Sequence, residues 1–445
     1  MPGWYRQVME VDYPRVNMAD KETISVNSRN TAAEILANWL RTKDFPDRLM
    51  DTVAADRAFV MEVVYGSVKR WRTLTWIMKK CVTGKTEPVA VPYLLVGLYQ
   101  IIFMTDVADY AAVSETVEAS KRRLSAGGSG FVNAVLRRAL REKQAIIRAL
   151  KAQPLAVRES HPDLLVDRWK TQFTAGRTVR LCKWNNGSPD VVICLNLART
   201  TIADYSELLK AMGQDATPHP FESRNCIIVP RGISVRELPG YADGLFSVQD
   251  ASMLTPVKLL DPKPGDCVLD ACAAPGGKTM LIAERIGPSG SLTAMDLRDD
   301  RLVELRENLA RMRFDSVKIV TGDAAAAGKV LGGDKFDRIL ADVPCSNTGV
   351  LRRRADARWR FSTERFETLR KTQRLILKGL APLLKPGGTL VYSTCSIEGE
   401  EGAVQIRGWL QAHPEFVLER EITLFPIDSG TDGLYAAALR KDGGK

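Results

Sequence analysis

The stretch VLDACAAPGGKT, residues 268–279, decides the fold of the C-terminal half of this chain. An apolar, strand-like run ends at Asp270, a turn of small residues follows, and an apolar helix is expected from about residue 280 to residue 286. Gly276 and Gly277 let the backbone approach a ligand closely, and the start of the helix offers free amide groups. The stretch therefore predicts a strand, a ligand-binding turn and a helix.

Two better-known phosphate motifs do not fit this turn. It lacks the G-x-G-x-x-G spacing of dinucleotide sites, and a P-loop would need a glycine where Cys272 stands. An ordinary tight strand-to-helix turn without a ligand remains the alternative for the motif taken alone. The residues that follow decide between these interpretations.

Strand and helix patterns continue to alternate after this turn. Four strand-like runs end in an acid or a cysteine: SLTAMD at Asp296, SVKIVTGD at Asp323, FDRILAD at Asp342 and GTLVYSTC at Cys395. The alternation predicts a doubly wound α/β sheet, whose ligands bind beyond the carboxyl ends of the strands. We expect Asp296 to bind ribose hydroxyls and Asp323 an adenine amino group, although each acid alone fits a helix N-cap equally well.

Cysteines follow two of these strands, in ADVPCSNTG (residues 341–349) and VYSTCS (residues 391–396). Carbon 5 of cytosine is too weak a nucleophile to attack a methyl sulfonium, so a thiolate must first add at carbon 6 and a second group must later help to expel it. Neighbouring strands lie about 4.8 Å apart, so both thiols can face one base if these two strands are neighbours in the sheet. The pair predicts methylation of a pyrimidine carbon with S-adenosylmethionine as the cofactor. A buried, unreactive cysteine is the alternative for either thiol.

Three motifs resemble those of the RNA 5-methylcytosine methyltransferases of the Nop2/Sun family: CAAPGGK (Cys272–Lys278), DVPCS (Asp342–Ser346) and STCS (Ser393–Ser396). Upstream, DRAFVMEVVYGSVKR, LLVGLYQIIFM, DYAAVSETVEASK and GFVNAVLRR resemble a NusB-like helical RNA-binding domain. Bacterial members with that domain act on small-subunit ribosomal RNA. The resemblance covers nearly the whole chain and implies the same substrate, as RNA or as an assembly intermediate.

The resemblance also implies that the strands ending at Asp342 and Cys395 are neighbours in the sheet, and it implies roles for single residues. Cys395 of the STC motif would be the nucleophile, and Cys345 of the DVPC motif would assist release of the product. DNA cytosine methyltransferases use the cysteine of a Pro-Cys motif instead, so Cys345 remains the alternative nucleophile. Asp342 would line both pockets and hydrogen-bond the cytosine edge. The candidate cofactor-binding residues are Cys272, Ala273, Ala274, Pro275, Gly276, Gly277, Lys278, Asp296, Asp323 and Asp342.

The resemblance and the hydrophobic periodicity together divide the chain into parts. We expect a loosely ordered leader over residues 1–27, an all-α NusB-like domain over 28–150, a small α+β linker domain over 151–255, and an α/β Rossmann-like class I methyltransferase domain over 256–445. Within the linker domain, VVICLNLAR and NCIIVP predict strands and DYSELLKAMG predicts a helix.

Composition favours a polyanionic partner. The 445 residues carry a formal net charge of +10, and the pI is about 9.2. The segment RRRADARWR, residues 352–360, holds five arginines directly after the first thiol loop, and we expect it to contact RNA phosphates. Other basic runs, around Trp71 and near the end of the N-terminal domain, are more simply solvated faces.

Several functions are excluded by what the sequence lacks. Eight cysteines without a C-x-x-C pair, with only three histidines, predict neither a metal site nor a disulfide framework. The N-terminus contains acids and no apolar core, so it does not predict a secretory signal. The longest apolar stretch, residues 93–104, is too short to span a bilayer. We expect a cytoplasmic, monomeric enzyme without a membrane role.

Three positions depart from the family pattern. Cys194 stands where the linker strand commonly has an arginine, Ala355 replaces a usual proline, and Gly402 replaces a frequent asparagine. None of them removes a residue that the chemistry requires. Two alternatives to a ribosomal RNA methyltransferase stay open: a noncatalytic ribosome-assembly or RNA-binding factor, and an enzyme acting on another RNA such as transfer RNA.

Overall fold

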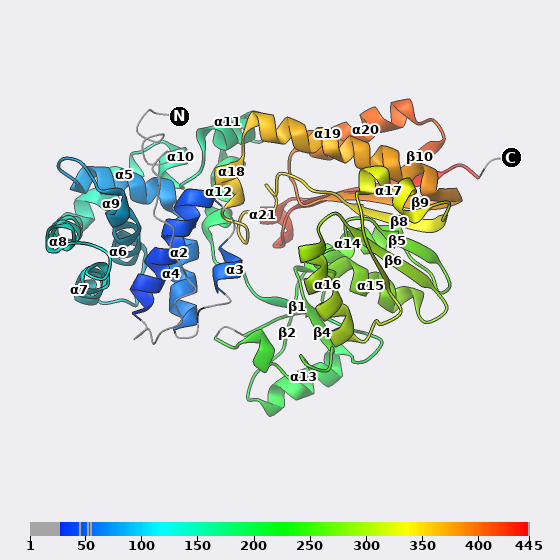
Figure 1. The fold of residues 1–445 in the computed structure, drawn as a ribbon, viewed down its shortest axis with the longest axis horizontal. Helices are drawn as coiled ribbons and strands as arrows, with labels where there is room; N and C mark the ends of the chain where they lie inside the picture. The colour runs from blue at the N-terminus through cyan, green and yellow to red at the C-terminus, as the bar shows by residue number, and fades with distance from the viewer. Residues whose placement is uncertain (1–26, 44–45, 51–52, 54–55, 231, 444–445) are drawn as a thin grey trace. The chain divides into compact units, whose positions relative to one another are not determined.

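The computed structural model describes residues 27–43, 46–50, 53, 56–230 and 232–443, which form two compact units (Figure 1). The first unit comprises Met1–Gly187 and Leu351–Phe361, and the second comprises Ser188–Val350 and Ser362–Lys445. The predicted leader lies outside the described residues except for Asn27. The predicted domain boundaries at 150 and 255 stay predictions, although the first unit continues to Gly187.

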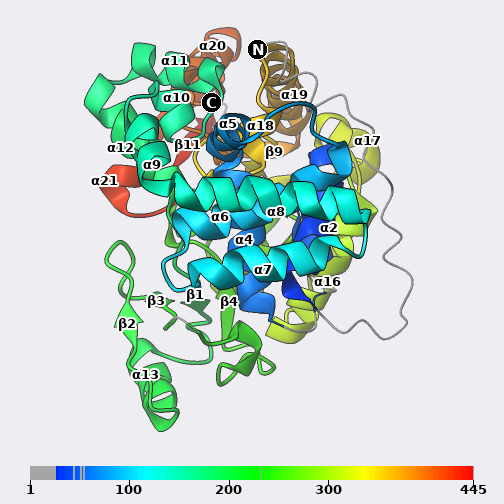
Figure 2. The same cartoon turned by 90° about the vertical axis from the view of Figure 1, so that its left-hand side faces the viewer.

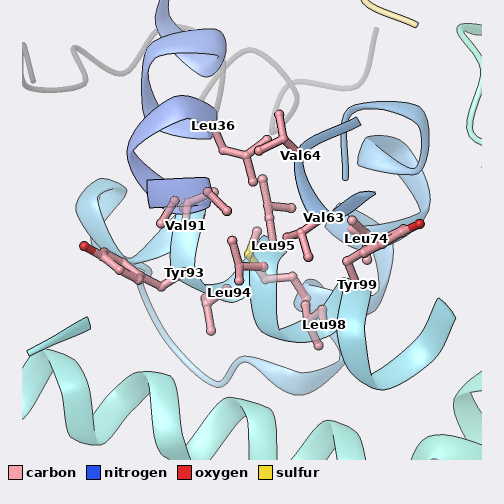
Figure 3. Packing of buried hydrophobic residues seen from close by; sticks show 14 of the residues in the cluster. Leu36, Val63, Val64, Leu74, Val91, Tyr93, Leu94, Leu95, Leu98 and Tyr99 are labelled. Atoms are coloured by element: carbon pink, nitrogen blue, oxygen red, sulfur yellow. The ribbon is translucent and has the colours of Figure 1, made fainter. Parts of the chain in front are cut away.

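The first unit is helical, as the sequence predicts. Its core forms around α6 (Val91–Phe103), whose sequence VPYLLVGLYQIIF is buried on nearly every side (Figure 3). A side chain at Gly97 would meet Leu136 of α8 at 2.5 Å, so this glycine lets α6 and α8 pack closely (Figure 2). The other helices are α2 (Ser28–Thr42), α3 (Asp47–Met50), α4 (Arg57–Lys69), α5 (Trp71–Cys81), α7 (Asp109–Ser120), α8 (Ala126–Arg141), α9 (Lys143–Lys151), α10 (Leu155–Arg158), α11 (Asp163–Gln172) and α12 (Ala175–Asn186).

The arginine-rich segment belongs to this helical unit and is packed into it. Trp359 of α18 (Ala357–Arg360) donates from Nε1 to the carbonyl of Val68 at 2.8 Å and meets Trp71 edge to face at 5.1 Å. Arg358 is 0% exposed and donates to Asn186 Oδ1 at 2.8 Å and to the carbonyl of Asn185 at 2.9 Å. The hypothesis that this segment contacts phosphates is therefore wrong for Arg358 and Trp359, because both side chains are internal.

The second unit contains a small antiparallel sheet in the order β2-β3-β1-β4 (Figure 2). Its strands are β1 (Val192–Leu195), β2 (Thr217–Pro218), β3 (Cys226–Ile228) and β4 (Phe246–Val248), and α13 (Ile202–Ala211) packs against them. The predicted strands and helix of the linker part are confirmed. Cys194, which stands where the family commonly has an arginine, faces Cys226 directly across β1 and β3 and is 1% exposed, so it belongs to the core.

A seven-stranded sheet in the order β10-β11-β9-β8-β5-β6-β7 forms the rest of the second unit (Figure 1). Its strands are β5 (Cys267–Asp270), β6 (Ser291–Asp296), β7 (Lys318–Thr321), β8 (Phe336–Asp342), β9 (Leu384–Thr394), β10 (Phe416–Leu424) and β11 (Leu434–Lys441). The five strands from β9 to β7 are parallel, and β10 and β11 add an antiparallel edge. The predicted α/β Rossmann-like fold is confirmed.

Helices cover both faces of this sheet because successive strand residues point to opposite sides. Leu269 and Leu390 pack with α19 (Thr363–Leu380) and α20 (Ala403–Ala412). Val268 and Val391 pack instead with α14 (Leu254–Leu260) and α15 (Gly277–Ile286), which therefore cover the other face. The remaining helices of this unit are α16 (Asp299–Met312), α17 (Ala327–Leu331) and α21 (Pro426–Ser429).

Replacing Arg358 by Met tests the structural role of the arginine-rich segment. The variant keeps much of the side chain's volume but leaves buried carbonyl groups without a donor, so we expect a loss of about 3 kcal/mol in stability. Calorimetry of the full chain would record a lower Tm for the helical unit. Arg137→Met on the exposed face of α8 is the matched control, with an expected change within about 0.5 kcal/mol. Equal losses in both variants would contradict the assignment.

Candidate active site

The site is built where β8 and β9 end side by side. These strands are parallel neighbours, with Asp342 opposite Ser393, and the backbone N–H of Val343 donates to the carbonyl of Ser393 at 3.0 Å. Beyond the strands, Gly349 donates to the carbonyl of Cys395 at 3.0 Å. The DVPC and STC motifs are thus two loops tied together by backbone hydrogen bonds.

These loops bring the two predicted thiols into contact. The Sγ atoms of Cys345 and Cys395 lie 3.1 Å apart. Cys345 is 6% exposed, whereas Cys395 is half-buried and reachable. The hydrogen bond with Cys395, together with burial, raises the pKa of Cys345 well above the usual value of a thiol. Cys345 is therefore held as a neutral thiol at neutral pH.

Asp342 is fixed beside the thiols by two side chains. Lys278 Nζ donates to its Oδ2 at 2.6 Å, and the hydroxyl of Ser393 donates to its Oδ1 at 2.6 Å. Burial by itself lowers the pKa of Lys278, but the Asp342 carboxylate outweighs burial and the pKa lies above its usual value. Lys278 is therefore a permanent cation, and Asp342 has a defined orientation with a side chain 31% exposed.

The predicted ligand-binding turn joins β5 to α15. Gly276 has φ 107°, in the left-handed region that favours glycine, and a side chain there would meet Leu305 at 2.5 Å. Asp296, at the end of β6, accepts a hydrogen bond from the backbone N–H of Ala274 at 3.1 Å, and Arg301 lies 3.6 Å from the same carboxylate. The strand-end acid thereby holds the turn in place.

The remaining predicted residues lie along the same edge of the sheet. Asp323 is exposed and caps a short 3₁₀ turn two residues beyond β7, which pairs with β6. Cys272 is half-buried in the turn after β5, next to Ala273 and Ala274, which are buried, while Pro275 is exposed. The site residues therefore form two groups. The first contains the two thiols and Asp342 at the ends of β8 and β9, together with Lys278 of α15, which binds Asp342. The second contains the turn after β5, with Asp296 at the end of β6 and Asp323 after β7.

Glu401 is a site residue that sequence reasoning missed. It is 0% exposed, and its carboxylate accepts hydrogen bonds from the backbone N–H of Ser346 at 2.9 Å, from the hydroxyl of Ser346 and from Gln373 at 2.9 Å. Burial raises the pKa of Glu401, and these hydrogen bonds oppose that rise. The residue fixes the loop that follows Cys345. An acid six residues after the STC cysteine was visible in the sequence, but nothing there showed its burial.

Asp270 is a second buried acid, and its pKa lies well above that of an exposed aspartate. Its Oδ2 accepts a hydrogen bond from the hydroxyl of Thr279 at 2.7 Å, and the residue is 1% exposed. Burial raises its pKa to about 7, against the effect of that hydrogen bond. Asp270 therefore holds its proton over a pH range in which an exposed aspartate is ionised.

Some features are absent from the described part of the chain. Among the residues that the structure describes, no three His, Cys, Asp or Glu side chains gather in a way that could hold a metal ion. None of the described helices is both long and apolar enough to cross a bilayer.

Fold and site together define a class I methyltransferase domain joined to a NusB-like helical domain. Three family descriptions match the chain: the NusB family over residues 26–141, a ferredoxin-like domain of RsmF/B-type methyltransferases over 161–236, and 16S rRNA methyltransferase RsmB/F over 257–440. The match to the ferredoxin-like domain agrees with the small antiparallel sheet of the second unit.

Curated relatives match over nearly their whole length. The chain is 32% identical to a probable ribosomal RNA small subunit methyltransferase B of Synechocystis, over 94% of this chain and 100% of the relative. It is 35% identical to ribosomal RNA small subunit methyltransferase B of Vibrio cholerae, over 87% of this chain and 90% of the relative. The chain therefore belongs to the ribosomal RNA small subunit methyltransferase B family, a Sun-type family with an N-terminal NusB-like domain.

Solved structures share the fold. The crystal structure of PH0851 has a TM-score of 0.77 at 23% identity and covers 94% of this chain and 100% of that chain. A methyltransferase homologue from Pyrococcus horikoshii has a TM-score of 0.57 at 27% identity and covers 64% of this chain and 97% of that chain.

The raised pKa of Asp270 predicts how stability depends on pH. The unfolded chain ionises Asp270 near 3.8 and the folded chain near 7, so stability falls as the pH rises between those values, by up to about 4 kcal/mol. Asp270→Asn should flatten this slope, measured as the difference in Tm between about pH 5 and pH 7.5. Asp334→Asn, at an exposed acid, should keep the slope of the parent protein. An unchanged slope in Asp270→Asn would overturn the assignment.

Proposed function

We propose that this protein transfers a methyl group from S-adenosylmethionine to carbon 5 of a cytosine in small-subunit ribosomal RNA. The contact that carries the proposal is the 3.1 Å approach of the Cys345 and Cys395 Sγ atoms at the ends of neighbouring strands. Methylation at oxygen or at an exocyclic amine needs no thiol, whereas methylation at carbon 5 needs one thiol to add and another group to help expel it.

The reaction begins with Cys395. Its thiolate adds to carbon 6, and the electron pair of the carbon 5–carbon 6 double bond makes carbon 5 nucleophilic enough to take a methyl group. A base then removes the proton from carbon 5, the double bond re-forms and the bond between Sγ and carbon 6 breaks. Cys345, which carries a proton, assists the departure of Cys395.

The unequal burial of the two thiols supports this division of roles. A nucleophile must be reachable by a flipped-out base, and Cys395 is half-buried while Cys345 is 6% exposed. Cys345 keeps its proton because hydrogen bonding to Cys395 and burial raise its pKa, which suits a proton donor. The opposite assignment would require the deeper thiol, with the raised pKa, to act as the nucleophile.

Asp342 is the third catalytic candidate. It is the last residue of β8, and hydrogen bonds from Lys278 and Ser393 orient its carboxylate. A carboxylate oriented in this way can accept a hydrogen bond from the exocyclic amine of cytosine, which uracil lacks. We propose that Asp342 selects cytosine while Cys395 attacks it.

The residues of the β5 turn fit the cofactor. Gly276 gives the backbone close approach, Asp296 can accept hydrogen bonds from ribose hydroxyls, and Asp323 can accept one from the adenine amine. When bound, S-adenosylmethionine supplies an electrophilic methyl group. We propose that the turn, from Cys272 to Lys278, positions that group on the side of the base opposite Cys395.

Family membership supports the choice of RNA. The relatives named above are ribosomal RNA small subunit methyltransferases, and the NusB family match covers residues 26–141. The net charge of +10 suits a polyanionic substrate. We also propose that the enzyme works in the cytoplasm as a monomer, on RNA or on an assembling ribosomal particle.

Single replacements of the two cysteines test the mechanism. With RNA and cofactor, Cys345→Ala should accumulate a covalent adduct of protein and RNA, since addition proceeds but release is slow. Cys395→Ala should form no adduct and should lose methylation by at least about 10³-fold. The adduct is measured as a shifted band on denaturing gels. Cys267→Ala, at the amino end of β5, is the control and should turn over normally.

Two results would contradict this mechanism or its substrate. Full turnover by Cys395→Ala would transfer the nucleophile's role to Cys345.

Bisulfite sequencing of total RNA from cells with and without the protein should show a protein-dependent 5-methylcytosine in small-subunit ribosomal RNA. A protein-dependent signal confined to transfer RNA would support methylation at carbon 5 but would refute small-subunit ribosomal RNA as the substrate.

The role of Asp296 in the cofactor site can be tested separately. Asp296→Asn keeps an acceptor for the Ala274 N–H but removes the charge that strengthens hydrogen bonds to ribose hydroxyls, so Kd for S-adenosylmethionine should rise about tenfold. Isothermal titration calorimetry measures this directly. Asp334→Asn should bind as the parent protein does, and equal affinity of the Asp296 and Asp334 variants would exclude a ribose contact.

A further inference from the structure

Asn347 lies between the two catalytic loops and contacts both of them. Its Nδ2 donates to the carbonyl of Cys345 at 3.1 Å, and its Oδ1 accepts a hydrogen bond from Cys395 Sγ at 3.0 Å. The residue has φ 60°, in the left-handed region where glycine is favoured and asparagine is tolerated. A glycine would satisfy the backbone here, so the carboxamide is not required by the turn itself.

We propose that Asn347 is a positioning residue for the Cys395 thiol: its carboxamide fixes the direction of Sγ and holds the thiol proton in the free enzyme. The inference rests on the proposed function only in treating Cys395 as the nucleophile. The contact itself is a property of this chain's own loop, PCSNTG.

The orientation of the carboxamide follows from its partners. A backbone carbonyl can only accept, so the nitrogen of the carboxamide must face the carbonyl of Cys345. The oxygen must then face Cys395, where it can only accept a proton from the thiol. Since Cys395 donates to Asn347, the Cys345 thiol donates in the 3.1 Å contact between the sulfurs. The result is a chain of hydrogen bonds from Cys345 through Cys395 to Asn347.

The hydrogen bond from Cys395 to Asn347 affects the reactivity of the nucleophile. An acceptor that faces a thiol stabilises its protonated form and opposes the thiolate. The thiolate is the reactive species toward both alkylating agents and a pyrimidine. On this proposal, the carboxamide of Asn347 holds the half-buried Cys395 thiol in one direction and favours its protonated form.

Other charged and titratable groups surround Cys395, and every variant below retains them. They are Cys345 on the β8 loop, Lys278 on α15, which feels the charge of Cys395, its partner Asp342, and Glu401, whose charge acts on Cys345. A difference between the parent protein and a variant at position 347 then reports the carboxamide alone.

The test measures alkylation of Cys395 by iodoacetamide as a function of pH, with the Cys395 peptide quantified by mass spectrometry. Asn347→Gly fits the left-handed backbone and removes only the carboxamide, so alkylation near pH 7 should rise about three- to tenfold. Asn347→Asp places a carboxylate against the thiol and should slow alkylation at least about tenfold, with the profile displaced to higher pH. Unchanged profiles in both variants would overturn the proposal.

A second readout separates positioning from folding. Asn347→Gly should lower kcat for RNA methylation about three- to tenfold and leave KM for RNA within about twofold, because the thiol loses its fixed direction. Cys395→Ala failing to lose methylation would refute the proposed nucleophile, whereas the alkylation profiles would still decide the contact with Asn347. Faster alkylation in both variants would show a loosened loop and would also refute the proposal.

Discussion

The parallel pairing of β8 with β9 is the constraint on which the site depends. Residues 50 positions apart in the chain meet because Asp342 stands opposite Ser393 and the ladder continues through Val343. Both strands are buried on both faces, so a slip in register would exchange the side chains that pack into the two cores and would disrupt the packing of both. The core of the sheet therefore sets the distance between two sulfur atoms in loops that have little core of their own.

Burial then gives chemically identical side chains different properties. Cys345 is buried and remains a thiol, while Cys395 is only half-buried. Behind them, Glu401 satisfies the backbone of Ser346 and fixes the loop from inside. A deeply buried acid is costly unless several donors surround it. Here the N–H and hydroxyl of Ser346 come from the loop after Cys345, and the amide of Gln373 comes from α19. The same contacts that neutralise this cost hold the loop in its geometry.

The segment after the catalytic loop shows how local composition can mislead. Five arginines in nine residues suggest a phosphate-binding surface, yet Arg358 and Trp359 lie in the core of the helical unit. There the guanidinium of Arg358 donates to the backbone carbonyl groups of Asn185 and Leu351. The chain leaves the methyltransferase unit at Val350, enters the helical unit at Leu351 and returns at Ser362. The polypeptide therefore passes between the two units twice more after Gly187. Both passages follow the Cys345 loop in the sequence.

The helical and α/β character of the parts and the ends of the strands could be predicted from the sequence, because strand period, turn glycines and motif spacing are local properties. The same motifs supplied the candidate site residues. That β8 and β9 are neighbours was implied by the resemblance to the methyltransferase family, and the structure confirms it. Burial and its effects became known only from the folded chain. They include the raised pKa of Asp270, the hydrogen bonds of Glu401, the internal position of Arg358 and the contact of Asn347 with Cys395. Burial and hydrogen-bond partners come from residues distant in the chain, so no local pattern encodes them.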